Sequence, residues 1–430
     1  MTERWGVVGG GMLGLALARD LRRLGHEVTV VERADHLGGL ADAWQVGEVT
    51  WDRHYHVTLA TDDHLLSLLD DLGLAEEMRW HHTRTGVYAD GQLHSVSTPV
   101  ELLRFPPLRI YDTVRLAVTL VYASRIRNWR RLESVPVASW LQRWSGRRTF
   151  ERFWRPLLES KLGDAYRETS AAFIWATIQR LTSARKRGLT DEVFGHVAGG
   201  YGRVFERFEE ELRRSGVAFK LGASVERVGR SGDHLSIDLA GGDKLEFDRV
   251  VVTAAAPVAA RLCEGLTPEE TGRLTAVRYL GIICPSVLVR GDLPDFYVTN
   301  LTDEGFPFTG VINMSAMVGT FDGASLVYLP RYLDPGHPLF EETDAAIEDS
   351  FVAGLLRVFP QLTPSDVLAT RTSRVRAVMA VPTLNYSDRV PNIETSVPGL
   401  YLASSANIVN GTLNVNETLQ LAEQALEIMT

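Results

Sequence analysis

The stretch "RWGVVGGGMLGLALARDLRRLGHEVTVVE", residues 4–32, decides the fold of this 430-residue chain. A short apolar run is followed by the pattern GxGxxG in "GGGMLG" (9–14), and leucines then recur at positions 13, 17, 21 and 24. This spacing predicts an amphipathic helix, and "EVTVVE" (27–32) predicts a second strand that ends at an acidic residue. A strand, a glycine turn, a helix, a strand and an acid in this order form a dinucleotide-binding unit.

Each position of this unit has a physical role. Gly9 permits the tight turn, Gly11 lets the backbone approach a pyrophosphate, and Gly14 lets the helix pack closely on the strand. The N-terminus of the helix offers unpaired N–H groups and the positive end of its dipole to phosphates. We expect Glu32 to accept hydrogen bonds from ribose hydroxyls and to repel a 2′-phosphate, which disfavours NADP.

Two adjacent glycines follow the acid in "ERADHLGGLADAW" (32–44). The pair Gly38-Gly39 lets the backbone pass close to a second charged or bulky part of the cofactor. This arrangement resembles the signature of FAD-binding oxidoreductases of the glutathione-reductase type, in which the glycine pair lies against the FAD pyrophosphate. The resemblance implies that the cofactor is FAD rather than NAD.

Further stretches extend the resemblance over essentially the whole chain. "HVAGGYGRVFERFEEELRRSG" (196–216) resembles the glycine-rich helix of that fold, and "VAFKLGASVERV" (217–228) resembles the strand that places a backbone group against adenine. The end of the chain, 398–429, reads as a strand, a loop and a helix, and the resemblance implies that the N-terminus of this helix points at the flavin. The sequence is similar to the protoporphyrinogen oxidase and flavin amine oxidase-like superfamily. It departs from it at Leu40, where amine oxidases usually show arginine, and at Ser404-Ser405, where many relatives carry Gly-Asp or Gly-Glu.

The resemblance implies a fold and a set of cofactor contacts. The expected fold is α/β, with a Rossmann-like FAD-binding domain (GR2 type) and an inserted α+β substrate domain. We expect the FAD-binding domain to be discontinuous, comprising 1–75, 195–265 and 385–430, and the substrate domain to comprise 76–194 and 266–384. The expected cofactor-binding residues are Gly9, Gly11, Met12, Gly14, Glu32, Arg33, Gly38, Gly39, Leu40, Val225, Ser404, Asn416 and Thr418.

The absence of a second nucleotide-binding motif indicates how electrons reach the flavin. There is no second GxGxxG, whereas flavoenzymes that draw on NAD(P)H through the glutathione-reductase architecture carry two nucleotide units. We therefore expect the flavin to exchange hydride directly with a small organic substrate. Amine oxidases of this superfamily often place a lysine near flavin N5 in the later half of the chain. No lysine follows Lys244, which argues against a simple amine oxidase without excluding one.

Candidate catalytic residues lie in two segments. In "DRHYH" (52–56), His54 and His56 point to the same face if the segment is extended, and in relatives this segment lies beside the flavin. The pair is interpreted either as an acid/base or substrate-positioning group or as two structural histidines. In "RFWRPLLESKLGD" (152–164), Lys161 shares a helix face with apolar residues. It either extends its charged end to solvent or meets a buried anion.

The composition limits the classes of binding partner that we expect for this chain. A formal net charge of −9 argues against a general nucleic-acid binder, and two cysteines without a CxxC fit the cytoplasm rather than a disulfide framework. No metal-ligand spacing is present, and no run of 18 apolar residues predicts a membrane span. The long apolar helix expected within 104–129 has basic ends. It could rest peripherally on a membrane surface or line an apolar substrate tunnel, although a core helix is the more frequent case.

Three functions stay open, and the sequence favours the first. It is an FAD-dependent oxidoreductase, an oxidase or a dehydrogenase, in which substrate hydride goes to flavin N5 and a histidine removes the accompanying proton. The second is a redox-neutral mutase or isomerase of a sugar nucleotide, because His54-Tyr55-His56 resembles the histidine segment of UDP-galactopyranose mutase. The third is a flavoprotein partner without catalysis.

Overall fold

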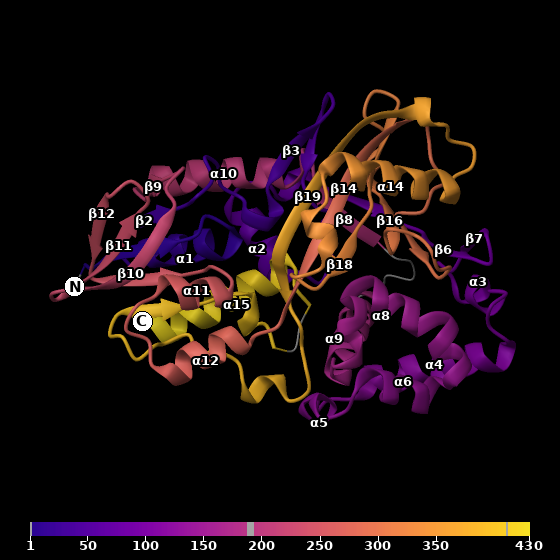
Figure 1. Ribbon diagram of the computed structural model, residues 1–430, viewed down its shortest axis with the longest axis horizontal. Coiled ribbons are helices and arrows are strands. Elements are labelled where there is room, and N and C mark those ends of the chain that lie inside the picture. The colour runs from indigo at the N-terminus through magenta and orange to yellow at the C-terminus, as the bar shows by residue number, and fades with distance from the viewer. Residues whose placement is uncertain (1, 187–192, 410–411) are drawn as a thin grey trace.

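The computed structural model describes residues 2–186, 193–409 and 412–430. Figure 1 shows two parts of the molecule. A parallel sheet and the helices packed on it form one end, and a larger, mostly antiparallel sheet with a layer of helices forms the other. The α/β fold with an α+β insertion that the sequence predicts is confirmed.

The parallel sheet contains the strands that flank the glycine turn. Its order is β20 (Leu400–Leu402), β13 (Arg249–Val252), β1 (Arg4–Val8), β2 (Glu27–Val31) and β9 (Ala218–Lys220), and all four pairings are parallel. Helix α1 (Met12–Arg23) connects β1 to β2 and buries Leu13, Leu17 and Leu21. Leu24, the last leucine of the series, lies at the C-cap and is exposed. Gly25 follows with a φ of +91°, as a glycine after a helix C-terminus commonly does.

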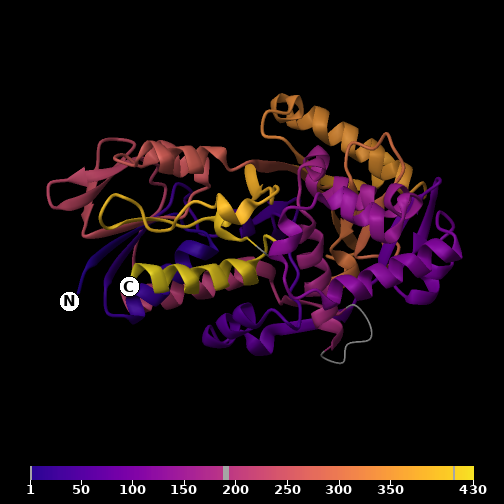
Figure 2. The same ribbon diagram turned by 90° about the horizontal axis from the view of Figure 1, so that it is seen from below.

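Two different layers cover the faces of this sheet. One face packs against α1 and three further helices (Figure 2): α2 (Asp63–Asp71), α10 (Gly200–Ser215) and α15 (Val415–Met429). The other face packs against a three-stranded antiparallel sheet of β10 (Val225–Ser231), β11 (His234–Leu239) and β12 (Lys244–Phe247), next to α11 (Ala256–Leu262) and α12 (Pro268–Ala276). The sequence predicts a three-stranded meander in 234–257 that re-enters the parallel sheet. The structure makes β10 the first strand of the antiparallel sheet, and β13 is the strand that joins the parallel one.

The second sheet is built around two long strands, β14 (Tyr279–Arg290) and β19 (Val367–Ala380), which pair with each other. Its other strands are β18 (Arg331–Leu333), β17 (Ala324–Tyr328), β16 (Gly310–Asn313), β15 (Val298–Leu301), β6 (Thr85–Ala89) and β7 (Gln92–Ser95). Helix α14 (Asp344–Val358) covers one face. The stretch "GVYADGQLHSV" (86–96) predicts a hairpin that turns at Asp90-Gly91. This hairpin is the β6–β7 connection, where both turn residues have positive φ.

A layer of helices completes this end of the molecule (Figure 1). It comprises α3 (Pro99–Leu103), α4 (Ile110–Arg125), α5 (Arg130–Glu133), α6 (Val137–Ser145), α7 (Arg147–Thr149), α8 (Arg155–Leu162) and α9 (Ala171–Lys186). The expectation of a core helix within 104–129 is wrong. Helix α4 buries Leu116 and Ala123 against its neighbours, but its opposite face is apolar and exposed.

Two small two-stranded sheets join the parts. Strands β3 (Ala43–Val46) and β4 (Val49–Asp52) form a hairpin, and β5 (Met78–His82) pairs with β8 (Val193–Val197). A short helix, α13 (Ser315–Val318), lies between β16 and β17. The limits that the sequence assigns to the two domains stay a prediction. No helix in the described ranges is both long and apolar enough to cross a membrane.

Candidate functional site

The turn between β1 and α1 has no room for a side chain at Gly9 or Gly14. Gly9 has a φ of +115°, and a Cβ atom at this residue would lie 2.3 Å from Thr253 Oγ1. A Cβ atom at Gly14 would lie 2.0 Å from the carbonyl oxygen of Gly9. A tight turn at Gly9 and close packing at Gly14 therefore have a direct steric basis.

A second glycine loop lies against the first. The N–H of Gly38 donates to the carbonyl oxygen of Gly10 at 3.0 Å, and Gly11 and Gly38 form a parallel β-bridge. Gly39 has a φ of +62°, and a Cβ atom there would lie 3.1 Å from the Cα of Gly11. The structure thus brings together the two glycine motifs that the sequence places on either side of β2.

Glu32 holds these two loops in place. Its Oε2 accepts a hydrogen bond from the N–H of Gly10 at 2.7 Å, and its Oε1 accepts one from the N–H of Ala34 at 2.8 Å. An ionised carboxylate has about four acceptor positions. Two of them therefore stay open for the ribose hydroxyls that the sequence predicts as its ligands.

The N-terminus of α1 provides a position for phosphate. Its N-cap residue, Gly11, provides no side-chain cap, and the first turn carries no acidic residue. The N–H groups of this turn can therefore bind phosphate oxygens. Helix α15 begins at the same edge of the sheet, because it too follows a strand of the parallel set. The residues present fit a dinucleotide whose pyrophosphate lies at the two glycine loops.

Four of the remaining residues predicted to bind the cofactor lie close to these loops in sequence or begin a strand. Met12 is buried as the first residue of α1, and Arg33 is exposed beside Glu32. Leu40 directly follows the glycine pair, and Val225 begins β10 at a register shift. Their contacts with the cofactor stay a prediction.

Three side chains of the C-terminal segment are already hydrogen-bonded within the protein. Ser404 Oγ accepts from the N–H of Ala406 at 3.3 Å, and Thr418 Oγ1 donates to a carbonyl of its own helix at 2.8 Å. Asn416 Oδ1 accepts from two backbone N–H groups in the first turn of α2, at 3.0 and 3.2 Å. Asn416 therefore caps α2, and any contact of these residues with the cofactor also stays a prediction.

His54 is a buried, neutral residue with both ring nitrogens hydrogen-bonded. Its Nδ1 lies 3.0 Å from the carbonyl oxygen of Leu40 and its Nε2 lies 2.9 Å from Ser373 Oγ. A carbonyl only accepts, so Nδ1 carries the proton and Nε2 accepts from the serine hydroxyl. Burial lowers the pKa of His54 to about 3. The side chain therefore fastens the second glycine loop to β19.

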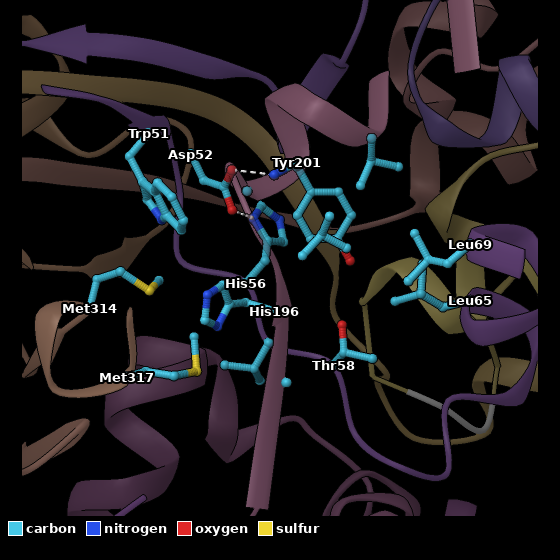
Figure 3. Close-up of a pocket in the computed structure, with 15 residues that line it drawn as sticks. Trp51, Asp52, His56, Thr58, Leu65, Leu69, His196, Tyr201, Met314 and Met317 are labelled. Carbon is cyan, nitrogen blue, oxygen red and sulfur yellow. Dashed lines mark hydrogen bonds and ion pairs between the residues drawn. The ribbon is translucent and has the colours of Figure 1, made fainter. Parts of the chain in front are cut away.

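His56 points into a small pocket with buried polar groups (Figure 3). Its Nδ1 lies 3.9 Å from Asp52 Oδ2 and is buried with no hydrogen-bond partner among the described residues. Asp52 Oδ1 accepts from the N–H of Tyr201 at 2.7 Å, which caps the N-terminus of α10. Burial lowers the pKa of His56 to about 4 and raises the pKa of Asp52 to about 8. The free space of the pocket, about 10 Å³, admits about one water molecule.

Lys161 contacts two tyrosines where the sequence allows a buried anion. Its Nζ donates to Tyr55 Oη at 3.2 Å and lies 5.1 Å from the ring centre of Tyr55 and 5.8 Å from that of Tyr332. The two tyrosine hydroxyls are 3.3 Å apart. Within the described residues, no carboxylate lies within ion-pair distance of Lys161. The side chain is exposed and places a positive charge against two aromatic faces.

Sequence reasoning missed five residues of this arrangement: Asp52, Tyr55, Tyr201, Tyr332 and Ser373. Asp52 and Tyr55 belong to the same short segment as the two histidines and carry a recognisable signal. The other three come from distant elements, and no local pattern relates them to 52–56. No cluster of metal-ligating side chains occurs in the parts of the chain that the structure describes.

The two glycine loops, Glu32 and the parallel sheet define a dinucleotide-binding α/β protein. The sequence matches the family described as flavin containing amine oxidoreductase over residues 14–414, and the chain belongs to this family. FAD is the cofactor that this membership supports. A coproporphyrinogen III oxidase of Propionibacterium freudenreichii is 23% identical over 336 residues, which are 63% of this chain and 60% of that protein. The chain thus matches less than two thirds of the length of this relative.

Solved structures share the fold over the whole chain. A reduced UDP-galactopyranose mutase superposes with a TM-score of 0.77 at 16% identity, covering 100% of this chain and 96% of that one. A putrescine oxidase bound to putrescine superposes with a TM-score of 0.74 at 15% identity, covering 100% and 99%. At these identities the likeness shows the fold.

Replacing Gly14 by alanine should prevent FAD binding. The new methyl group would overlap the carbonyl oxygen of Gly9, so the turn must open and α1 must move away from β1. We expect Gly14→Ala to purify with less than about a tenth of the wild-type flavin. The movement of the turn and of α1 should weaken FAD binding by more than about 1.4 kcal/mol, which corresponds to a tenfold change in the dissociation constant. The measurement is the ratio of flavin to protein absorbance. Gly272→Ala is the matched control, since nothing lies near its Cβ position. Full flavin content in Gly14→Ala would contradict the cradle.

Acid should destabilise the protein partly through His54. Its pKa is lowered in the folded state from 6.5 to about 3, so the unfolded chain binds the proton more readily. The stabilisation is complete above pH 6.5 and is lost as the pH falls towards 3. We expect His54→Gln to be less stable at pH 7.5 by about 1–3 kcal/mol and to lose less stability between pH 6.5 and 4. Urea unfolding across this range, with His234→Gln as a surface control, measures both. An unchanged slope in His54→Gln would refute the assignment.

Proposed function

We propose that the chain oxidises a small organic substrate by transferring a hydride from its C–H bond to N5 of FAD, with no nicotinamide domain of its own. The observation that carries the proposal is the direct connection between the dinucleotide cradle and the histidine segment. Arg53 donates to the carbonyl oxygen of Gly39 at 2.8 Å, and His54 donates to that of Leu40. Bound FAD supplies the two-electron acceptor, and the chain itself binds the substrate, orients it and handles the proton.

The contacts of Lys161 support a substrate class. An amine substrate is a cation at neutral pH and would need the aromatic faces of Tyr55 and Tyr332. The ammonium of Lys161 already occupies that position and would repel a second cation. A neutral or anionic substrate is compatible with it, and Lys161 with the tyrosine hydroxyls can orient a carboxylate or a hydroxyl group. The absence of any lysine after Lys244 is a second argument against an amine.

The two histidines divide the remaining tasks. His54 has no free ring nitrogen and acts as a positioning residue for the glycine loop. His56 is neutral at pH 7, and its Nδ1 is unpartnered among the described residues and lies near Asp52. Because the pKa of Asp52 is raised to about 8, the two side chains together hold one proton near neutral pH. In the form in which Asp52 is ionised, its carboxylate is our candidate to accept, through His56, the proton that leaves with the hydride.

Anion selectivity should depend on Lys161. We expect benzoate to perturb the flavin absorption of the holoprotein saturably and benzylamine to have no effect at the same concentration. In Lys161→Gln the dissociation constant for benzoate should rise about tenfold, because a hydrogen bond to a charged group contributes roughly 1.5–3 kcal/mol. Lys244→Gln is the matched control, as this lysine is exposed on β12. Stronger binding of benzylamine than of benzoate would exclude the proposed substrate class.

Oxidation itself is tested under anaerobic conditions. Hydroxy acids, alcohols and amines are mixed one at a time with the oxidised holoprotein, and the flavin absorbance is followed. A substrate of the proposed class should bleach the flavin stoichiometrically. His56→Gln should slow this bleaching by roughly 10²-fold or more at neutral pH, the usual scale of general acid–base catalysis, while leaving the flavin content unchanged. Equal rates in His56→Gln and the wild type would remove His56 from the mechanism.

The redox-neutral alternative keeps one specific observation in its favour, the resemblance of His54-Tyr55-His56 to the histidine segment of UDP-galactopyranose mutase. A mutase would act on a sugar nucleotide only after the flavin had been reduced, and the flavin would remain reduced at the end. Dithionite-reduced protein incubated with UDP-galactopyranose, with product analysis by chromatography, separates the two functions. Isomer formation without oxidation would favour the mutase.

A further inference from the structure

Helix α4 presents its apolar side to solvent. Ile110 is 73% exposed, Val114 51%, Val118 59% and Val121 47%, whereas Asp112, Thr113 and Thr119 are buried against the rest of the protein. The inner side of α4 also buries Leu116 and Ala123, but a helix on the surface of a globular protein normally exposes polar and charged residues on its outer side. Figure 1 places α4 on the outer side of the helical layer.

The exposed apolar residues form one continuous stripe. Residues three or four positions apart lie on the same side of a helix, so Ile110, Val114, Val118 and Val121 line up along α4. Helix α3, which packs beside α4, adds Val100 and Leu103, which are 55% and 44% exposed. We call these six residues the α3–α4 face. Tyr111 and Tyr122 flank it and are exposed as well.

The surroundings of the α3–α4 face are strongly basic in an otherwise acidic protein. Residues 104–155 contain twelve arginines and three acidic residues, a net charge of +9, while the whole chain carries −9. The ring centroids of Trp144 and Tyr122 lie 4.2 Å apart with their planes tilted by 31°, and Arg143 Cζ lies 6.0 Å from the ring centroid of Trp144, so α6 adjoins this surface. Exposed arginines that form no ion pair within the described residues lie at both ends of α4 and on α6 and α7, namely Arg104, Arg109, Arg125, Arg127, Arg143 and Arg147.

We propose that the α3–α4 face binds the surface of an anionic lipid bilayer. Aliphatic residues on one side of a helix enter the boundary between headgroups and acyl chains, and arginines at its border bind lipid phosphates. Tyrosines such as Tyr111 and Tyr122 suit the interface, because one end of the ring is apolar and the other is polar. The charge also argues against a second copy of the chain as the occupant, since two faces of the same positive charge repel each other.

Binding to vesicles tests this assignment with the full-length holoprotein. We expect sedimentation with vesicles of phosphatidylcholine and phosphatidylglycerol, at least about tenfold weaker binding to phosphatidylcholine alone, and weakening by added salt. Val114→Glu combined with Val118→Glu should abolish binding, and Arg125→Glu combined with Arg127→Glu should weaken it at least about tenfold. These side chains are exposed, so flavin content and melting temperature should stay those of the wild type.

Matched controls and a competing outcome complete the experiment. Leu368→Glu and Ile428→Glu alter residues that are 44% and 49% exposed on other elements, and both variants should bind vesicles like the wild type. No sedimentation at low salt, or equal loss in these controls, would overturn the proposal. So would a wild-type dimer in analytical ultracentrifugation that Val114→Glu with Val118→Glu converts to a monomer, because a second copy would then cover the face.

Discussion

The contact between two glycine loops is the constraint on which the rest of the site depends. The chain after β2 returns so closely to the first turn that Gly38 donates to Gly10, and a Cβ atom at Gly39 would lie only 3.1 Å from the Cα of Gly11. Glu32 holds both loops through backbone N–H groups. The histidine segment is anchored to this contact. Arg53 and His54 bind the carbonyl oxygens of Gly39 and Leu40, so the segment that enters the second half of the molecule starts from a fixed point on the cofactor cradle.

Residues 51–56 are then fixed by elements from all parts of the chain. Ser373 on β19 holds the ring of His54, and the hydroxyl of Tyr328 donates to the backbone carbonyl of Asp52. The carboxylate of Asp52 in turn caps α10. A side chain held on several sides keeps one orientation, which suits a positioning role, whereas a group that exchanges protons needs an unoccupied nitrogen. By this criterion His54 is suited to positioning and His56 to proton exchange, although the two residues lie only two positions apart.

The cradle could be predicted from sequence because its signals are local. The GxGxxG turn, the leucine spacing of α1 and the C-terminal helix each depend on a few neighbouring residues, as does the Asp90-Gly91 hairpin of the second sheet. The partners of the histidine segment could not, because Tyr332 and Ser373 reach it only through the pairing of β18 and β19 with β14. The exposed side of helix α4 could not be predicted from the sequence for a different reason. The helix carries apolar residues on both sides, Leu116 and Ala123 inside and Val114 and Val118 outside, so its pattern does not show which side faces the core.

The uneven distribution of charge would orient the molecule at a charged surface. Since residues 104–155 carry +9 and the whole chain −9, the remaining surface is acidic enough to be repelled by any surface that attracts the helical layer. An anionic surface would therefore both bind the α3–α4 face and turn the parallel sheet away from it. Helix α8 lies in the same layer and carries Lys161 towards Tyr55. A substrate that partitions into such a surface would reach the proposed site from the side of the helices, whereas the parallel sheet extends away from it toward the opposite end of the molecule (Figure 1).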